Sequence, residues 1–328
     1  MTNSGEQILT FDHLSISYGN VQAVRDLTLS IRRGEVVGLV GESGSGKSTV
    51  LRSAVGLLHR SGQVTAGSII YEGRDITHAS QSELASLRGS GMSYIFQDPT
   101  ASLDPLYTIK KQFDECILAH RKLQADELDH LEIELLADMG FDDPERILAS
   151  YPHELSGGMC QRVVIALGLA CDPTLLLADE PTSALDVVVQ AEVLDALLSV
   201  RDAHDVAILI VSHNMGAIAK SADRIGVMCH GTLVEEGSTE EVLERPFHPY
   251  TRALIQAIPR TDGTLPVASR LRVDQAATED EKVCVFAQQC PSCCEACQST
   301  APEWLSLSST HRALCHNGHL LADREGDQ

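Results

Sequence analysis

Short apolar runs alternate along the chain with amphipathic segments. The runs at 35–40 ("EVVGLV"), 174–180 ("TLLLADE") and 206–213 ("VAILIVSH") are largely apolar, which is typical of strands buried on both faces of a parallel sheet. Helix-like segments follow at about 47–58 and 187–201. Strands that alternate with helices predict an α/β fold, in which a mostly parallel sheet is flanked by helices.

Two other segments depart from this alternation. Residues 96–150 have a mostly helical pattern, and "RIGVMCHGTLVEEG" at 224–237 predicts a hairpin with a His-Gly turn. After this hairpin a short helix at 239–245 leads into a polar, turn-rich tail. We therefore expect a core at 1–237 and a C-terminal extension at 238–328.

The composition narrows the classes of function. Of the 328 residues, 43% are hydrophobic, which is enough for a substantial core, and the formal net charge is −21. Nucleic-acid backbones reward Lys and Arg, so we expect no nucleic-acid partner. The N-terminus has no basic start followed by an apolar run. The apolar run at 206–211 is far shorter than the roughly 20 residues that span a bilayer. We expect a cytosolic protein, or one held at a membrane by partners.

A glycine-rich loop carries the clearest chemistry. The sequence "GESGSGKS" at 41–48 lies between a predicted strand and a predicted helix, and it fits the pattern G-x-x-x-x-G-K-[ST]. Its glycines let backbone N–H groups converge on phosphate oxygens. Lys47 would bring a positive charge to the β- and γ-phosphates, and the Ser48 hydroxyl would bind Mg²⁺. The expected nucleotide-binding residues of this loop are Gly41, Ser43, Gly44, Ser45, Gly46, Lys47, Ser48 and Thr49.

Two adjacent acids end the second apolar run. Asp179 and Glu180 close "LLLADE", and a hydrolytic nucleotide site needs one acid for the metal and one for the water. We expect Asp179 to help hold Mg²⁺ and Glu180 to orient or deprotonate the attacking water.

A second glycine turn lies at 154–170, in "ELSGGMCQRVVIALGLA". Ser156 can cap a helix that begins at Gly157 and Gly158, and a glycine turn at a helix N-terminus can hold an anion. This turn has no lysine of its own. By itself, it is also compatible with a helix cap that binds no ligand.

Taken together, these motifs resemble the nucleotide-binding subunits of ABC transporters over about residues 8–260. The resemblance implies a P-loop ATPase with an N-terminal antiparallel β-subdomain and a helical subdomain at about 97–160. It also implies that two such domains dimerise head to tail, so that the P-loop of one and the Ser156–Gly158 turn of the other enclose the same ATP. The lysine-free turn would then complete the partner's site.

The same resemblance assigns four further residues. It implies that Tyr18 stacks on adenine and that Gln97 contacts Mg²⁺ and water in a loop facing the membrane subunits. It further implies that Asp186 reaches across the dimer and that His213 contacts the γ-phosphate and orients Glu180. Plainer interpretations stay open: Tyr18 as an edge-strand tyrosine, Gln97 as a solvated loop residue, and Asp186 as part of a helix N-terminus.

The segment "RPFHPYTRALIQAIP" at 245–259 is similar to ATP-binding subunits for dipeptide and oligopeptide import. Relatives that import nickel or other small solutes share these features. The implied partners are two transmembrane permease subunits, a second ATPase that is a paralogous chain, and, indirectly, an extracytoplasmic substrate-binding protein. The implied place is the cytoplasmic face of the inner membrane. A soluble ABC ATPase without a transport role is the alternative, and the absence of a long coiled-coil pattern argues against it.

Six of the ten cysteines crowd into 284–315. The spacing of Cys284, Cys290, Cys297 and Cys315 resembles a four-cysteine tail that holds a [4Fe–4S] cluster in some of these subunits. Cys293 and Cys294 add overlapping C-x2-C pairs, which also suit zinc. We expect an iron–sulfur cluster on Cys284, Cys290, Cys297 and Cys315, with zinc, no metal or a disulfide as the alternatives.

Overall fold

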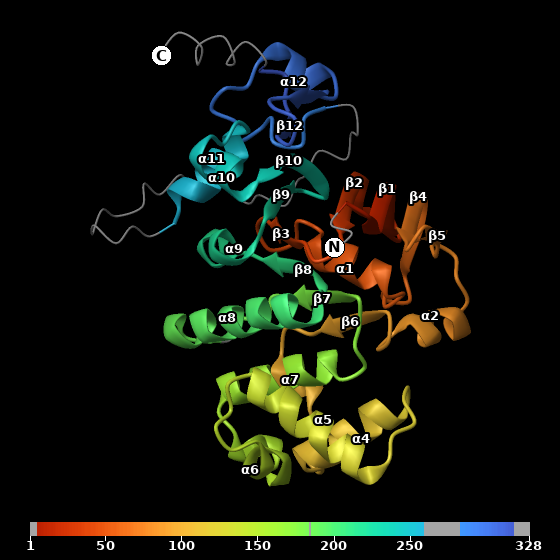
Figure 1. Ribbon diagram of the computed structural model, residues 1–328. Helices are drawn as coiled ribbons and strands as arrows, with labels where there is room; N and C mark the ends of the chain where they lie inside the picture. Colours follow the sequence, from red (N-terminus) through yellow and green to blue (C-terminus); the bar gives the residue numbers. More distant parts are fainter. Residues whose placement is uncertain (1–4, 184, 259–282, 318–328) are drawn as a thin grey trace.

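The structure is a computed structural model that describes residues 5–183, 185–258 and 283–317. The described strands form two sheets (Figure 1). A four-stranded sheet has the order β2-β1-β4-β5, and an eight-stranded sheet has the order β11-β12-β10-β9-β3-β8-β7-β6. None of the helices in the described ranges is long and apolar enough to cross a bilayer.

The smaller sheet is antiparallel and belongs to the N-terminal part of the chain. Its second strand alternates buried Leu27, Leu29 and Ile31 with more exposed neighbours, as expected when one face of a sheet packs on a core. This confirms the predicted antiparallel β-subdomain. The strands are β1 (Gln7–Tyr18), β2 (Val21–Arg32), β4 (Gly62–Tyr71) and β5 (Arg74–Asp75).

The larger sheet contains the predicted apolar runs as parallel neighbours. Every residue of its strands β3 (Val36–Val40), β7 (Leu175–Asp179) and β8 (Ala207–Ser212) is buried. The pairs β3–β8, β7–β8, β6–β7 and β3–β9 are all parallel. The α/β architecture is therefore confirmed. The remaining elements of this region are β6 (Met92–Ile95), β9 (Arg224–Cys229), α1 (Lys47–Ala54), α8 (Val187–His204) and α9 (Met215–Ser221).

Helix α1 ends at Ala54, four residues before the predicted end. Gly56 has a φ of +64°, a left-handed conformation that ends a helix and that glycine adopts at low cost. The periodicity of the apolar residues continued past this point, so the sequence pattern overestimated the helix.

A group of helices forms the lower part of the molecule in Figure 1. Its buried side chains include Phe113, Leu136 and Val163, which belong to the same hydrophobic core as the larger sheet. The helices are α3 (Pro99–Ser102), α4 (Ile109–Leu118), α5 (Ala125–Asp138), α6 (Pro144–Ala149), the 3₁₀ helix Pro152–Glu154 and α7 (Gly157–Leu169), while α2 (Gln81–Leu87) lies beside β5 and β6.

The C-terminal extension adds two strands to the larger sheet. Strand β12 pairs antiparallel with β10, and β11 pairs with β12. Sequence analysis predicted neither short strand. The boundary at 237/238 stays a prediction, although the sheet is continuous across it. The elements are β10 (Thr232–Ser238), α10 (Thr239–Glu244), α11 (Pro249–Gln256), α12 (Glu295–Ser299), β11 (Trp304–Ser306) and β12 (Arg312–Leu314).

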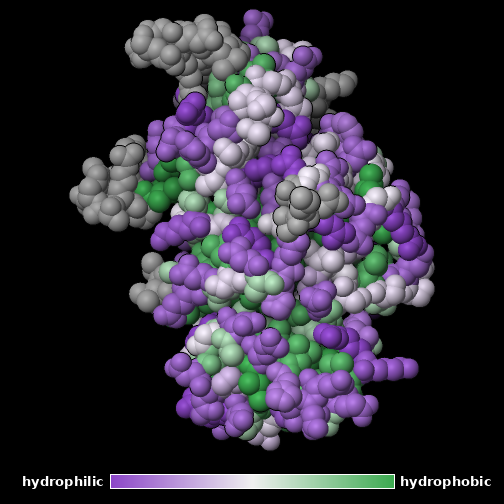
Figure 2. Space-filling view, viewed as in Figure 1, coloured by the Kyte–Doolittle hydropathy of each residue, from purple (hydrophilic) through white to green (hydrophobic). Residues whose placement is uncertain are grey.

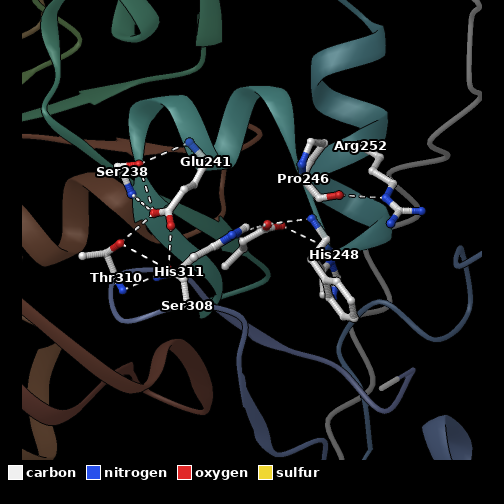
Figure 3. Close-up of polar contacts among 10 residues, drawn as sticks. Ser238, Glu241, Pro246, His248, Arg252, Ser308, Thr310 and His311 are labelled. Carbon is white, nitrogen blue, oxygen red and sulfur yellow. Dashed lines mark hydrogen bonds and ion pairs between the residues drawn. The ribbon is translucent and has the colours of Figure 1, made fainter. Parts of the chain in front are cut away.

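Two carboxylates hold the 308–311 turn in place, one from the sheet and one from α10. Buried Glu235 of β10 accepts hydrogen bonds from His311 Nε2 at 2.7 Å and from the His248 backbone N–H at 2.8 Å. Nearby, Glu241 accepts from Ser308 Oγ at 2.6 Å and from Thr310 Oγ1 at 2.9 Å (Figure 3). The two anchors hold the 308–311 turn against β10 and α10.

The Glu241 anchor predicts a pH-dependent stability. Burial raises the pKa of this carboxyl, but hydrogen bonds from Ser308, Ser238 and Thr310 outweigh it and lower the pKa to about 2. Because the folded-state pKa lies below the unfolded value of about 4.3, the stabilisation is complete above that value and is lost as the pH falls toward 2. We expect Glu241→Gln to lower the melting temperature more at pH 7 than at pH 3.

Thermal unfolding at both pH values measures this difference, and Glu240→Gln on the exposed side of the same helix is the control. An equal loss of melting temperature at pH 7 and pH 3 would contradict the prediction.

Candidate active site

The active-site residues meet at one edge of the larger sheet because its strands are parallel. Val40 at the end of β3 lies opposite Ser212 at the end of β8, and Asp179 at the end of β7 lies opposite Val211. The loops that follow these strands therefore leave from the same edge, the usual site of ligand binding in α/β sheets. They carry the 41–48 loop, the acid pair and His213.

The glycine loop wraps around its own lysine. Lys47 is 4% exposed, and its Nζ donates to the carbonyls of Gly41 and Glu42, both at 2.8 Å. Burial lowers the pKa of Lys47, while the nearby carboxylates of Glu180 and Asp179 raise it. At Gly46, φ is +98° and a Cβ would lie 2.4 Å from the Ala23 carbonyl. The loop conformation thus depends on glycine at that position.

A cavity of about 880 Å³ opens beside this loop. It lies within the size range of small-molecule sites, and residues from five separate segments of the chain meet in it. The lining residues are Ala23, Ser43, Gly44, Gly46, Lys47, Ser48, Thr49, Gln97, Asp98, Glu180, Ser183 and His213.

One side of the site holds a fixed carboxylate. Asp179 is 1% exposed and its Oδ1 accepts from Ser48 Oγ at 2.6 Å. Its Oδ2 accepts from the Tyr94 hydroxyl at 2.7 Å and lies 3.5 Å from Arg52 Nη2. Burial and the charge of Asp179 raise the pKa of Tyr94, so the phenol stays protonated and donates. Hydroxyl and carboxylate oxygens are ligands that Mg²⁺ accepts, so this pair fits a magnesium ion.

Sequence reasoning missed both Tyr94 and Arg52. Arg52 lies four residues after Ser48, one turn along α1, and this spacing was a usable signal. Tyr94 reaches Asp179 only because β6 pairs with β7, and a single sequence does not reveal that pairing.

The other side of the site gathers three predicted residues. Glu180 Oε2 lies 2.9 Å from His213 Nδ1 and accepts from Gln97 Nε2 at 3.3 Å. Glu180 has a φ of +49°, a conformation that costs a non-glycine residue free energy and that clusters at functional sites. The structure thus brings Gln97, Glu180 and His213 together over the cavity.

The second glycine turn lies elsewhere on the surface. Ser156 caps α7 by accepting from the Met159 backbone N–H at 3.3 Å. Ser156 and Gly157 are exposed, and neither they nor Gly158 line the cavity. The turn is therefore available to another molecule.

Asp186 and Tyr18 lie outside the lining as well, as do Gly41, Ser45 and Asp179. Asp186 accepts from the Val189 backbone N–H at 3.0 Å, at the start of α8. Tyr18 ends β1, where its ring packs over Gly62. Their assigned roles, contact across a dimer and stacking on adenine, stay predictions.

The structure does not support the predicted metal centre in the extension. Across 5–183, 185–258 and 283–317, no three or more His, Cys, Asp or Glu side chains are grouped to hold a metal ion. The closest described thiol contact joins Cys294 to Cys297 at 3.4 Å. Without a bound metal, burial raises the pKa of four of these thiols, those of Cys284, Cys290, Cys297 and Cys315.

Comparison with known proteins identifies two regions of the chain. Residues 24–183 match the family model "ABC transporter", and residues 234–297 match "Oligopeptide/dipeptide transporter, C-terminal region". The second match covers most of the extension's described part and ends at Cys297.

Similar curated proteins cover nearly the whole chain. It is 36% identical to the dipeptide transport ATP-binding protein DppD of Bacillus subtilis, covering 94% of each chain. It is 39% identical to the oligopeptide transport ATP-binding protein AppD of the same organism, covering 93% of each. For DppD of Escherichia coli the identity is 37%, covering 94% of this chain and 96% of the relative.

Solved structures share the fold of the core. The ATP-binding cassette MJ0796, a dimer bound to ADP and Pi, has a TM-score of 0.62 and 27% identity, covering 71% of this chain and 99% of that one. For cbiO1 of Clostridium perfringens, part of an ABC transporter complex, the TM-score is 0.65 and the identity 27%, covering 73% of this chain and 92% of that one. The expected P-loop ATPase fold is confirmed.

Proposed function

Since the chain belongs to the family of ABC transporter ATP-binding subunits, we propose that it hydrolyses ATP to power the import of di- or oligopeptides through a membrane transporter. The observation that carries the proposal is the convergence of Lys47, Ser48, Gln97, Glu180 and His213 on one cavity. The cargo class rests on the relatives, which are named for dipeptide and oligopeptide transport and are similar over the extension as well as the core.

We assign ATP binding to the glycine loop. Lys47 is already surrounded by backbone carbonyls, and a triphosphate offers its ammonium stronger, charged acceptors. Ser48 and Asp179 would hold Mg²⁺, with Tyr94 and Arg52 fixing the carboxylate. Bound Mg²⁺ would neutralise the charge that develops on the phosphates during phosphoryl transfer.

We assign the activation of water to Glu180. Its carboxylate faces the cavity, and Gln97 and His213 restrict its orientation. A general base has to be held within hydrogen-bond reach of the proton that it removes. Gln97 and His213 are thus positioned to hold the Glu180 carboxylate in the orientation that a general base needs. Both also line the cavity, where they could contact a bound nucleotide.

We assign the completion of the site to a second ATPase subunit, which the family resemblance expects to be a paralogous chain. The exposed turn at Ser156–Gly158 begins α7, whose first N–H groups and dipole favour an anion. In a head-to-tail pair this turn would face the triphosphate held by the partner. ATP would then bind two subunits together, and hydrolysis would release them.

We assign membrane attachment to partner subunits. Figure 2 shows hydrophobic patches among hydrophilic ones over the lower part of the molecule, where Figure 1 draws α4–α7. Leu106 is 80% exposed and Tyr107 46% exposed in this part, and Phe96, beside Gln97, is 46% exposed. These side chains are suited to contact two permease subunits at the cytoplasmic face of the membrane, with a substrate-binding protein on the other side.

Replacement of the proposed base tests the function. In membranes that contain the assembled transporter, we expect peptides to stimulate ATP hydrolysis, and Glu180→Gln to reduce the rate at least 100-fold because the base is lost. ATP-dependent association of the subunits should persist. The rate of phosphate release, measured with dipeptides, oligopeptides or Ni²⁺ complexes as cargo, tests both the role of Glu180 and the class of cargo.

Glu72→Gln is the matched control, because Glu72 has a similar left-handed φ of +47° but lies outside the cavity. Unchanged hydrolysis in Glu180→Gln would contradict the assignment of the base. Stimulation by Ni²⁺ complexes and not by peptides would contradict the assigned cargo.

The second glycine turn gives a separate prediction. A Cβ on Gly157 would meet only Leu185 Cδ2, at 3.8 Å, and an acidic residue in the first turn suits a helix. Gly157→Asp should therefore fold and bind ATP normally. Its carboxylate would repel a partner's triphosphate, so we expect ATP-dependent dimerisation and hydrolysis to be lost.

Light scattering of the chain mixed with the second ATPase subunit, with and without ATP, measures the dimerisation, and Gly157→Asn provides the uncharged control. Normal ATP-dependent dimerisation of Gly157→Asp would exclude contact between this turn and a nucleotide.

A further inference from the structure

One contact joins the C-terminal extension directly to the glycine loop. The hydroxyl of Tyr250, in α11, accepts a hydrogen bond from the Glu42 backbone N–H at 3.0 Å. Tyr250 is 2% exposed, and burial raises the pKa of its phenol, so the group is neutral. The two residues lie 208 positions apart in the chain.

The peptide unit that Tyr250 holds is also bound to Lys47. The Glu42 N–H and the Gly41 carbonyl belong to the same planar peptide group. The N–H end donates to Tyr250, and the carbonyl end accepts from Lys47 Nζ at 2.8 Å. Rotation of this peptide would therefore change the position of the ammonium.

The surroundings of this peptide leave little freedom. At Gly41, φ is +154° and a Cβ would lie 2.2 Å from the Met228 carbonyl. The backbone of the loop thus packs directly against the end of β9. In such a site the hydrogen bond from Glu42 selects one orientation of the peptide among few that fit.

Tyr250 is itself fixed by the extension. Its backbone N–H donates to His248 Nδ1 at 3.1 Å, and burial lowers the pKa of His248 to about 4, so this nitrogen is an acceptor at neutral pH. The ring of Phe286 packs edge-on against the Tyr250 ring, with centroids 5.4 Å apart. Phe286 is 2% exposed and lies two residues after Cys284.

We propose that Tyr250 is a positioning residue for the glycine loop, through which the C-terminal extension sets the affinity of the site for ATP. The proposal rests on the proposed function, because it takes the loop and Lys47 as the phosphate-binding elements. Tyr250 contacts no nucleotide; it fixes the peptide that holds the ammonium. Packing of Phe286 then makes the geometry of the ATP site depend on the cysteine-containing segment.

Removal of one oxygen atom tests the proposal. Tyr250→Phe keeps the ring but leaves the Glu42 N–H without this acceptor, and a neutral hydrogen bond of this kind changes an equilibrium about 2- to 10-fold. We expect the dissociation constant of ATP to rise by that factor, while kcat at saturating ATP stays within about twofold.

Calorimetric titration of ATP measures the dissociation constant in the full chain with Glu180→Gln, which prevents turnover. Steady-state kinetics with Glu180 intact measure kcat. Tyr71→Phe is the matched control: Tyr71 is 3% exposed, and its hydroxyl forms a 2.7 Å hydrogen bond to Thr174 away from the cavity. Both variants should lose thermal stability, but only Tyr250→Phe should lose affinity for ATP.

A second variant tests the path through the extension. Phe286→Leu keeps an apolar side chain but removes the ring contact, and we expect it to weaken ATP binding in the same direction. Combined with Tyr250→Phe, its effect should be less than additive, since both act through one hydrogen bond.

An unchanged dissociation constant in Tyr250→Phe would overturn the proposal, as would an equal rise in Tyr71→Phe, since either result leaves Tyr250 with a purely structural role. Failure of the proposed function gives a different result: the chain with Tyr250 intact would bind no ATP.

Discussion

The parallel pairing of β3, β8 and β7 is the constraint on which the rest of the structure depends. Parallel strands end at the same edge of a sheet, so the loops that follow them lie together. In this chain those loops carry Lys47, Asp179, Glu180 and His213. Every residue of these strands is buried, so apolar packing on both faces of the sheet holds the strands in place. Hydrophobic packing thus sets the geometry of a highly polar site.

Neighbouring groups hold each functional side chain of the site in place. Lys47 is held by carbonyls of its own loop, Asp179 by Ser48 and Tyr94, and Glu180 by Gln97 and His213. These contacts reduce the reorganisation that binding and phosphoryl transfer require. The left-handed backbone of Glu180 has an energetic cost, which the surrounding sheet offsets. Tyr250 adds a contact from the extension, so the proposed ATP site draws on the core and the extension together.

Local sequence predicted the parts of the site that follow apolar runs. The glycine loop, the acid pair and His213 each come directly after a buried strand, so strand prediction also located them. Contacts between distant segments were not predictable in this way. Tyr94 reaches Asp179 through strand pairing, β12 joins β10 across more than 70 residues, and Tyr250 reaches Glu42 across 208. The predicted iron–sulfur or zinc centre rests on cysteine spacing alone, and across the described residues these thiols are not grouped to hold a metal ion.

The central claim is that each subunit binds ATP with one loop and completes its neighbour's site with another. The most direct measurement is the structure of the assembled transporter, carrying Glu180→Gln and loaded with ATP and Mg²⁺. We expect Lys47 to leave the carbonyls of Gly41 and Glu42 for the phosphates, and the Ser156–Gly158 turn of this chain to lie against the triphosphate that the facing ATPase binds. A loaded assembly in which the Ser156–Gly158 turn faces solvent would contradict the central claim.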